Sequence, residues 1–213
     1  MALTKVRGGG VDNPLTLGGG AASDRSIIFD GNAQDFHIGL DDSEDKLTIG
    51  LGSTLGTTSH MVIDANGHIN KPLQPAFFAK LSSHITNIAK DGSVTIVFDT
   101  EIFDQNADFN NSNGFFTAPV TGRYAIYFNT RTDSIETDVT WWQWTIGASN
   151  RNVSILTSAE QFDATTSQFG QNIAMIIDMD ANDTVHMSWY QNGGTQSIDI
   201  SNHVTYFGGY LVC

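Results

Sequence analysis

The chain has little that would cross-link it or bind it to polyanions. It contains one cysteine, Cys213, so no disulfide can form within it and stability must come from packing and assembly. Lysine and arginine together number 10 against 23 aspartates and glutamates, a net charge of −13. This deficit of basic residues excludes general nucleic-acid binding and disfavours anionic membranes. No apolar run reaches the ~18 residues that a membrane span needs. We therefore expect no nucleic-acid partner and no membrane insertion.

The first ten residues, MALTKVRGGG, lack the apolar core of a secretory signal, so we expect synthesis in the cytosol without secretion. Residues 1–24 are rich in glycine, and such a segment cannot fold alone. It is either a disordered leader or an arm that orders on a partner, and the arm is favoured. Its apolar anchors would be Leu3, Val6, Val11, Leu15 and Leu17.

Proline is rare, with four residues, and two of them mark the best boundary in the chain. The segment Lys71-Pro72-Leu73-Gln74-Pro75 stiffens the backbone and interrupts strand pairing. It separates a unit of short strands at 25–74 from a longer domain at 75–213. The short strands are RSIIFD, DFHIGLDD, DKLTIGLGS and HMVIDANGHIN. They are too few to bury a core in one chain, whereas three copies around an axis would do so. We therefore expect a β-rich stalk that supports trimerisation.

Residues 75–213 alternate between apolar segments and turn residues, with no amphipathic helix. We expect about ten strands and an all-β jelly-roll sandwich. The candidate strands are PAFFAKLS, VTIVFDTEIF, GFFTAPV, GRYAIYFNTRT, TDVTWWQWTIGAS, QNIAMIIDMD, DTVHMSWYQ and HVTYFGGYLVC.

The stretch GFFTAPVTGRYAIYF, residues 114–128, is a corner between two of these strands. Its Gly-x-Phe-Thr-Ala-Pro pattern, centred on Phe116, resembles the globular heads of the complement q-subcomponent family, relatives of tumour necrosis factor. Three further segments agree in order: Pro75-Ala76-Phe77, Val97-Phe98-Asp99, and the closing Phe207, Gly209, Tyr210 and Leu211. The resemblance implies a homotrimeric jelly-roll head that binds a partner and is not an enzyme. The collagen-like repeats of the animal proteins are absent.

A second resemblance covers the first third of the chain. The phrases FDGNAQDFHIGLDDS and IDANGHI, and the leader MALTKVRGGGVDNP, are similar to bacteriophage tail-fibre and virion-appendage proteins. This implies a virion protein whose residues 1–24 attach to another virion component, at the tail, near the portal or on the capsid. The head would then adhere to a host surface glycan or protein. A capsid fibre or decoration protein and a glycan depolymerase are the alternatives.

Aromatic residues are the candidates for the core and the trimer interface. In a strand, Trp141 faces opposite to Trp142 and Trp144. Either both faces are buried, one in the sandwich and one between subunits, or one face is a stacking platform for sugar rings. The full set is Phe77, Phe116, Tyr124, Phe128, Trp141, Trp142, Trp144, Phe207 and Tyr210.

Three segments rich in Asn, Gln, Ser and Thr are the candidate receptor-binding loops: 104–113, 147–167 and 191–202. Their side chains suit hydrogen bonding to carbohydrate, and loops at the distal end of a head are the usual place for recognition. The candidate residues are Asp104, Asn106, Asn110, Asn113, Asn150, Asn152, Gln161, Asn192 and Gln196.

No cofactor or metal is expected. Calcium is the alternative for two acidic turns, although neither has EF-hand spacing. The turns hold Asp41, Asp42, Glu44 and Asp45 in the first case, and Asp178, Asp180 and Asp183 in the second. His60 or His68 could also meet its copies on a threefold axis. Catalytic motifs are missing, but the paired carboxylates of a depolymerase would leave no motif.

Overall fold

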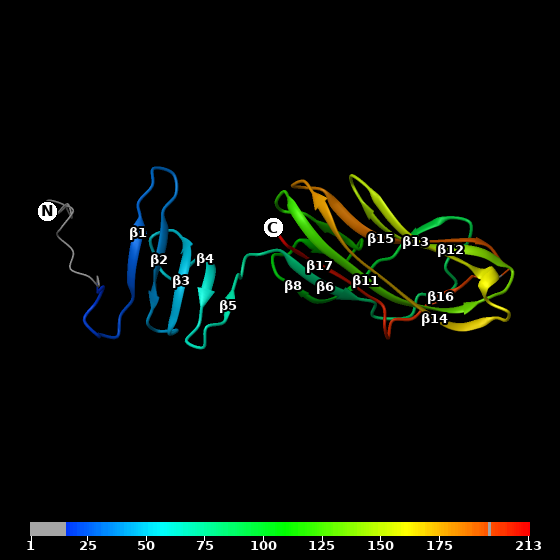
Figure 1. The fold of residues 1–213 in the computed structure, drawn as a ribbon, viewed down its shortest axis with the longest axis horizontal. Coiled ribbons are helices and arrows are strands. Elements are labelled where there is room, and N and C mark those ends of the chain that lie inside the picture. The colour runs from blue at the N-terminus through cyan, green and yellow to red at the C-terminus, as the bar shows by residue number, and fades with distance from the viewer. Residues whose placement is uncertain (1–15, 196) are drawn as a thin grey trace. The chain divides into compact units, whose positions relative to one another are not determined.

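The computed structural model describes residues 16–195 and 197–213, and the chain divides into two compact units between Leu73 and Gln74 (Figure 1). The expected anchors Leu3, Val6, Val11 and Leu15 lie outside the described residues, as does Gln196.

The first unit is a single antiparallel sheet in which each strand pairs with the next. Its strands are β1 (Arg25–Phe29), β2 (Phe36–Asp41), β3 (Lys46–Leu51), β4 (Ser59–Ile63) and β5 (Ile69–Asn70).

The register of this sheet gathers apolar side chains on one face. Ile27, Ile38, Ile49 and Met61 form one row across β1 to β4. Apolar residues at both ends of the sheet stay largely exposed, with Phe29 at 60%. The opposite face holds the buried ring of His37, whose Nδ1 lies 2.9 Å from the carbonyl oxygen of Gly52. One chain alone therefore does not cover the apolar face of this unit.

The second unit is an all-β sandwich of two antiparallel sheets. The expected jelly-roll class is confirmed. We call one layer the tryptophan sheet; it contains, in order, β13 (Asn152–Ser158), β12 (Val139–Ala148), β15 (Thr184–Gly193), β10 (Phe115–Thr117) and β9 (Phe109–Asn110), and β7 (Ser93–Thr95) also pairs with β15. We call the other layer the tyrosine sheet; it contains β14 (Thr166–Met179), β11 (Gly122–Ile135), β17 (Tyr206–Leu211), β6 (Ala76–Lys80) and β8 (Thr100–Asp104), and β16 (Asp199–Ile200) also pairs with β11. A short 3-10 helix at Ala159–Gln161 follows β13.

Aromatic rings fill the space between the two sheets. Phe77 of β6 stacks on Phe116 and Phe109, with ring centroids 4.7 and 5.0 Å apart. Phe128 of β11 meets Trp144 of β12 at 4.7 Å. Contacts of this kind between offset or tilted rings add to the free energy of burial.

The central corner is held by a buried tyrosine and a glycine. Tyr124 is fully buried, and its hydroxyl donates to the carbonyl oxygen of Val120 at 2.7 Å. Gly114 has a φ of +80°, and a Cβ there would lie 2.6 Å from the carbonyl oxygen of Ile96. The corner therefore needs glycine both for its backbone conformation and for the close approach of the neighbouring segment.

Two strand predictions were wrong. The segment VTIVFDTEIF is not one strand: β7 and β8 belong to different sheets, and the chain crosses between the layers at residues 96–99. Ile96 and Phe98 are buried in this crossing, which explains why the segment reads as a continuous apolar strand. Residues 152–158, expected within a loop, form β13, in which Val153, Ile155 and Thr157 alternate with the outward-facing Asn152, Ser154, Leu156 and Ser158.

We expect Phe77→Ala to lower the free energy of unfolding by about 3–5 kcal/mol, because it leaves a cavity among stacked rings. Chemical denaturation at a fixed protein concentration measures the change. The control is Leu156→Ala, at a side chain that is 57% exposed, where the change should stay within about 0.5 kcal/mol. A Phe77→Ala protein as stable as the control would contradict the assigned core.

Candidate self-association face

The outward face of the tyrosine sheet is an apolar surface that the second unit leaves open. Even-numbered residues of β11 from Tyr124 to Thr132 point into the core, so the odd-numbered ones point outward. The register builds two apolar rows across the sheet: Ile176–Ala125–Tyr210–Ala76, and Ala174–Tyr127–Gly208–Phe78–Phe103. We call these two rows, with Tyr206, the self-association face.

Aromatic rings on this face contact one another and remain partly in solvent. The ring of Phe78 lies 5.4 Å from Tyr206 and about as close to Tyr127 and Phe103, at 6.0 and 6.1 Å. Burial, with a smaller effect of Tyr210, raises the pKa of Tyr127. Ile176 is 63% exposed and Tyr210 50%. Contiguous apolar surface of this kind is typical of a protein interaction site.

Gly208 is what lets the ring of Tyr127 lie against β17. A Cβ at position 208 would come within 2.5 Å of Tyr127 ring atoms, closer than real contacts allow. The ring of Tyr127 on β11 therefore occupies the space that a side chain at position 208 on β17 would need.

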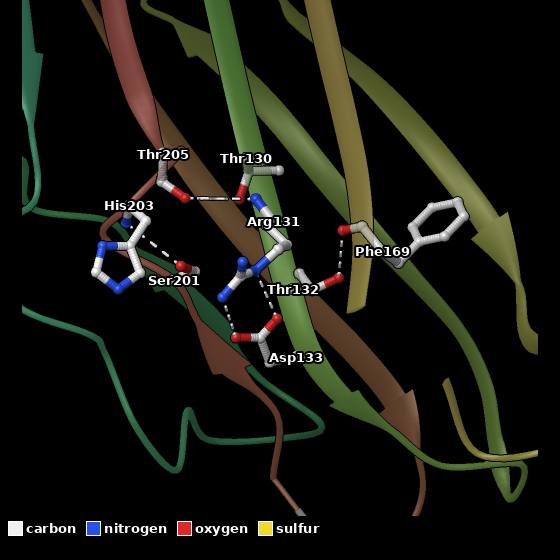
Figure 2. Close-up of polar contacts among 8 residues, drawn as sticks. All are labelled: Thr130, Arg131, Thr132, Asp133, Phe169, Ser201, His203 and Thr205. Carbon is white, nitrogen blue, oxygen red and sulfur yellow. Dashed lines mark hydrogen bonds and ion pairs between the residues drawn. The ribbon is translucent and has the colours of Figure 1, made fainter. Parts of the chain in front are cut away.

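The outward surface of β11 is apolar at Ala125 and Tyr127 and carries an ion pair farther along the strand. Figure 2 shows Arg131 and Asp133, two residues apart and both outward, with Nε 2.8 Å from Oδ1 and Nη2 donating to Oδ2 at 3.0 Å. Their side chains are only 23% and 21% exposed. A second copy packed on this surface must match both an apolar end and a charged end, which favours one register over others.

Buried threonines underlie the ion pair (Figure 2). The hydroxyl of Thr132 donates to the carbonyl oxygen of Phe169 at 3.2 Å, and the hydroxyls of Thr130 and Thr205 lie 3.3 Å apart. His203 lies beside them, with its backbone N–H donating to Ser201 Oγ at 3.3 Å. Because their hydrogen bonds are satisfied, these hydroxyls replace apolar core residues at limited cost.

The aromatic residues expected in the core or interface separate into three places. Most are fully buried: Phe77, Phe116, Tyr124, Phe128, Trp142, Trp144 and Phe207. Tyr210 lies on the self-association face rather than in the core, because β17 turns it outward opposite Ala125. Trp141 lies on the outward face of the tryptophan sheet, where it is partly exposed.

The expected receptor-binding loops do not meet at one end of the sandwich. The chain enters the head at Gln74, and Gln105 Nε2 donates to the carbonyl oxygen of Gln74 at 2.7 Å, which places Asp104 and Asn106 at this entry end. Asn150 is there too, donating to the carbonyl oxygen of Asp178 at 2.9 Å. Gln161 follows β13 at the opposite end, where Gly193 of β15 pairs with Val139 of β12.

Several candidates are strand residues rather than loop residues, contrary to expectation. Asp104 ends β8, Asn110 belongs to β9, Asn152 to β13 and Asn192 to β15. Asn113 lies in the turn between β9 and β10, where its Oδ1 accepts from the backbone N–H of Phe115 at 3.0 Å. A binding role for these residues stays a prediction.

The acidic turns are occupied by local contacts. Glu44 pairs with Lys46 at 2.8 Å, and Asp178 pairs with Arg151 at 2.6 Å. The backbone N–H of Asp180 donates to Asp183 at 2.9 Å. His68 Nδ1 lies 2.9 Å from Asp64, and this contact lowers the pKa of Asp64. Within residues 16–195 and 197–213, no group of three His, Cys, Asp or Glu side chains is placed to hold a metal ion.

No helix in the described part of the chain is long and apolar enough to span a membrane.

The two-layered antiparallel sandwich of the second unit is a jelly roll of the complement type. The C1q domain family matches residues 76–212, and the chain belongs to this family. The globular domain of zebrafish complement 1qA is similar at 17% identity and a TM-score of 0.50, over 66% of this chain and 98% of that one. Murine APRIL at pH 8.0 matches at 10% identity and 0.48, over 65% and 99%. No curated protein matches.

A buried carboxylate at the entry end gives a pH prediction. Burial, then the charge of Asp104, raises the pKa of Asp108, so its ionised form is disfavoured in the folded state. The unfolded chain has an Asp pKa of ~3.9, and ionisation of Asp108 begins to lower the free energy of unfolding as pH rises through that value. The loss of stability is complete above the higher pKa of Asp108 in the folded state. We expect Asp108→Asn to be more stable than wild type near pH 7, with a difference that shrinks toward about pH 4.

Urea denaturation of both proteins across this range measures the difference. A variant that is less stable near pH 7, or a difference that does not vary with pH, would contradict the assignment.

Proposed function

We propose that this chain is a homotrimeric structural protein of a bacteriophage virion, a short tail fibre whose head adheres to the host cell surface. In this proposal residues 1–24 attach to another virion protein, residues 25–74 form the stalk and residues 75–213 form the head. The protein is a binding protein and not an enzyme, in keeping with a family that is typically non-enzymatic.

One observation carries the assembly: each unit presents an apolar sheet face that its own chain leaves open. In the first unit this is the face of Ile27, Ile38 and Ile49. In the second it is the self-association face. Burying such area stabilises an assembly by roughly 25 cal/mol per Å². Homotrimers are known for this family, and closed cyclic symmetry lets every copy bury the same face.

The virion context is supported by the sequence of the first unit and the leader. The phrases FDGNAQDFHIGLDDS and IDANGHI occupy the sheet of the first unit, where collagen-like repeats stand in animal members of the family. In a fibre, three heads on one stalk also raise the effective affinity of a weak site without any new contact.

The assembly is tested by a charge placed on each outward face. We expect Ile176→Glu, on the self-association face, to convert the trimer into monomers, because three carboxylates would be buried without partners. Native mass spectrometry of the full chain measures the mass. The matched control is Leu156→Glu, at an equally exposed aliphatic residue on the other sheet, which should keep the trimer mass. A wild-type monomer at micromolar concentration would refute the proposal.

The location is tested by electron microscopy of virions labelled with an antibody to residues 75–213. Label at the tail is the expected result. Label on the capsid would instead make the chain a head fibre or decoration protein, and unlabelled virions would refute a virion role.

A further inference from the structure

The outward face of the tryptophan sheet carries no charged side chain, although the protein has a net charge of −13. The register defines its members: Trp141, Gln143, Thr145 and Gly147 on β12; Asn152, Ser154, Leu156 and Ser158 on β13; His186, Ser188, Tyr190 and Asn192 on β15; and Ser93, Thr95, Phe115, Thr117 and Asn110 on the shorter strands. None of these is Asp, Glu, Lys or Arg. We call this surface the neutral face.

Two aligned rings lie on this face, near the end that holds Ser158 and Asn192. Trp141 and Tyr190 are diagonal neighbours on β12 and β15, with centroids 5.1 Å apart and planes 20° apart. All four tryptophans of the chain are described, and Trp142, Trp144 and Trp189 are buried in the core. Trp141 is thus the tryptophan that solvent or a ligand can reach.

Amide and hydroxyl groups beside the rings are held in place. Gln143 Nε2 donates to Thr145 Oγ1 at 2.8 Å and to Ser154 Oγ at 3.0 Å, and these two hydroxyls lie 2.8 Å apart. Asn192 and Ser158 are the direct cross-strand neighbours of Trp141, one on each side. Because the network already orders the Gln143 side chain, a ligand that contacts it meets a smaller entropic cost.

The histidine on this surface does not add charge near neutral pH. His186 stacks on Phe115 with centroids 4.3 Å apart, and burial lowers the pKa of its imidazole. The face therefore stays uncharged across its whole width.

We propose that the neutral face binds an uncharged glycan, with a sugar ring stacked on Trp141 and Tyr190 and its hydroxyls bonded to Gln143, Asn192 and Ser158. Flat aromatic rings suit the apolar face of a sugar, and amide and hydroxyl groups both donate to and accept from sugar hydroxyls. The acidic net charge of the chain opposes polyanionic saccharides. The inference rests on the proposed function, and it moves the binding site from the loops to a sheet.

The neutral face and the self-association face belong to different layers of the sandwich. Trimerisation through the tyrosine sheet therefore leaves three neutral faces accessible, and a fibre would present three copies of the site.

The test is binding of the full chain to a glycan array that contains both neutral and acidic oligosaccharides. We expect wild type to bind neutral glycans. Trp141→Ala should lose about ten-fold or more in affinity, which is ~1.4 kcal/mol or more, because the stacking surface is removed, and Trp141→Phe should keep most of the binding. Asn106→Ala, at the entry end, tests the competing loop site, and the control is Val120→Ala, at an exposed residue outside both named faces, which should bind as wild type does.

Acrylamide quenching of tryptophan fluorescence gives a second measurement that does not depend on a variant. A neutral oligosaccharide that binds on the array should protect wild type from quenching, because the other three indoles are already buried. Unchanged quenching at saturation would refute the site.

Native mass spectrometry of Trp141→Ala confirms that it is folded and trimeric. Three array results would overturn the inference: no bound glycan, binding to acidic glycans alone, or equal binding by Trp141→Ala. Binding that Asn106→Ala loses and Trp141→Ala keeps would return recognition to the loops and leave the proposed function intact. A monomeric wild type or unlabelled virions would instead refute the proposed function.

Discussion

The head depends on the alternation of side chains along β11, which lies between β14 and β17 in the tyrosine sheet. Tyr124, Ile126 and Phe128 point inward and pack against the rings of the opposite layer. Ala125 and Tyr127, between them, point outward and form the middle of the self-association face. A shift of one residue in the pairing of β11 would exchange these two sets. The same register therefore specifies both the core of the sandwich and the apolar rows of the self-association face.

The two units differ in how they cover the apolar faces of their sheets. The head buries one face of each sheet against the other and is left with two outward faces, one apolar and one neutral and polar. Within residues 16–73 the first unit has one sheet and no second layer, so none of its described strands covers the apolar face. In both units the open apolar face lies where another copy of the chain can cover it. A small sheet is not independently stable when its apolar face is in water.

Much of this was readable in the sequence, and the exceptions have physical causes. Alternation predicted opposite faces for Trp141 and for the buried pair Trp142 and Trp144, because that pattern is local to one strand. Strand β13 was missed since three of its four outward residues, Asn152, Ser154 and Ser158, are polar and resemble a loop. The crossing at residues 96–99 was missed since buried Ile96 and Phe98 mimic a strand. Which loops lie at the same end of the sandwich depends on pairings between strands that are distant in sequence, such as β6 with β17. No local sequence pattern predicts these pairings.

The place where the chain enters the head has a mechanical consequence. Strand β6 begins just after Pro75 at the entry end and runs between β17 and β8, paired with both. A load that pulls residue 74 away from the head along this strand acts parallel to β6 and across its hydrogen bonds. These bonds are then loaded together in shear rather than broken one at a time from an end. The point at which the chain enters the sandwich is thereby suited to tension.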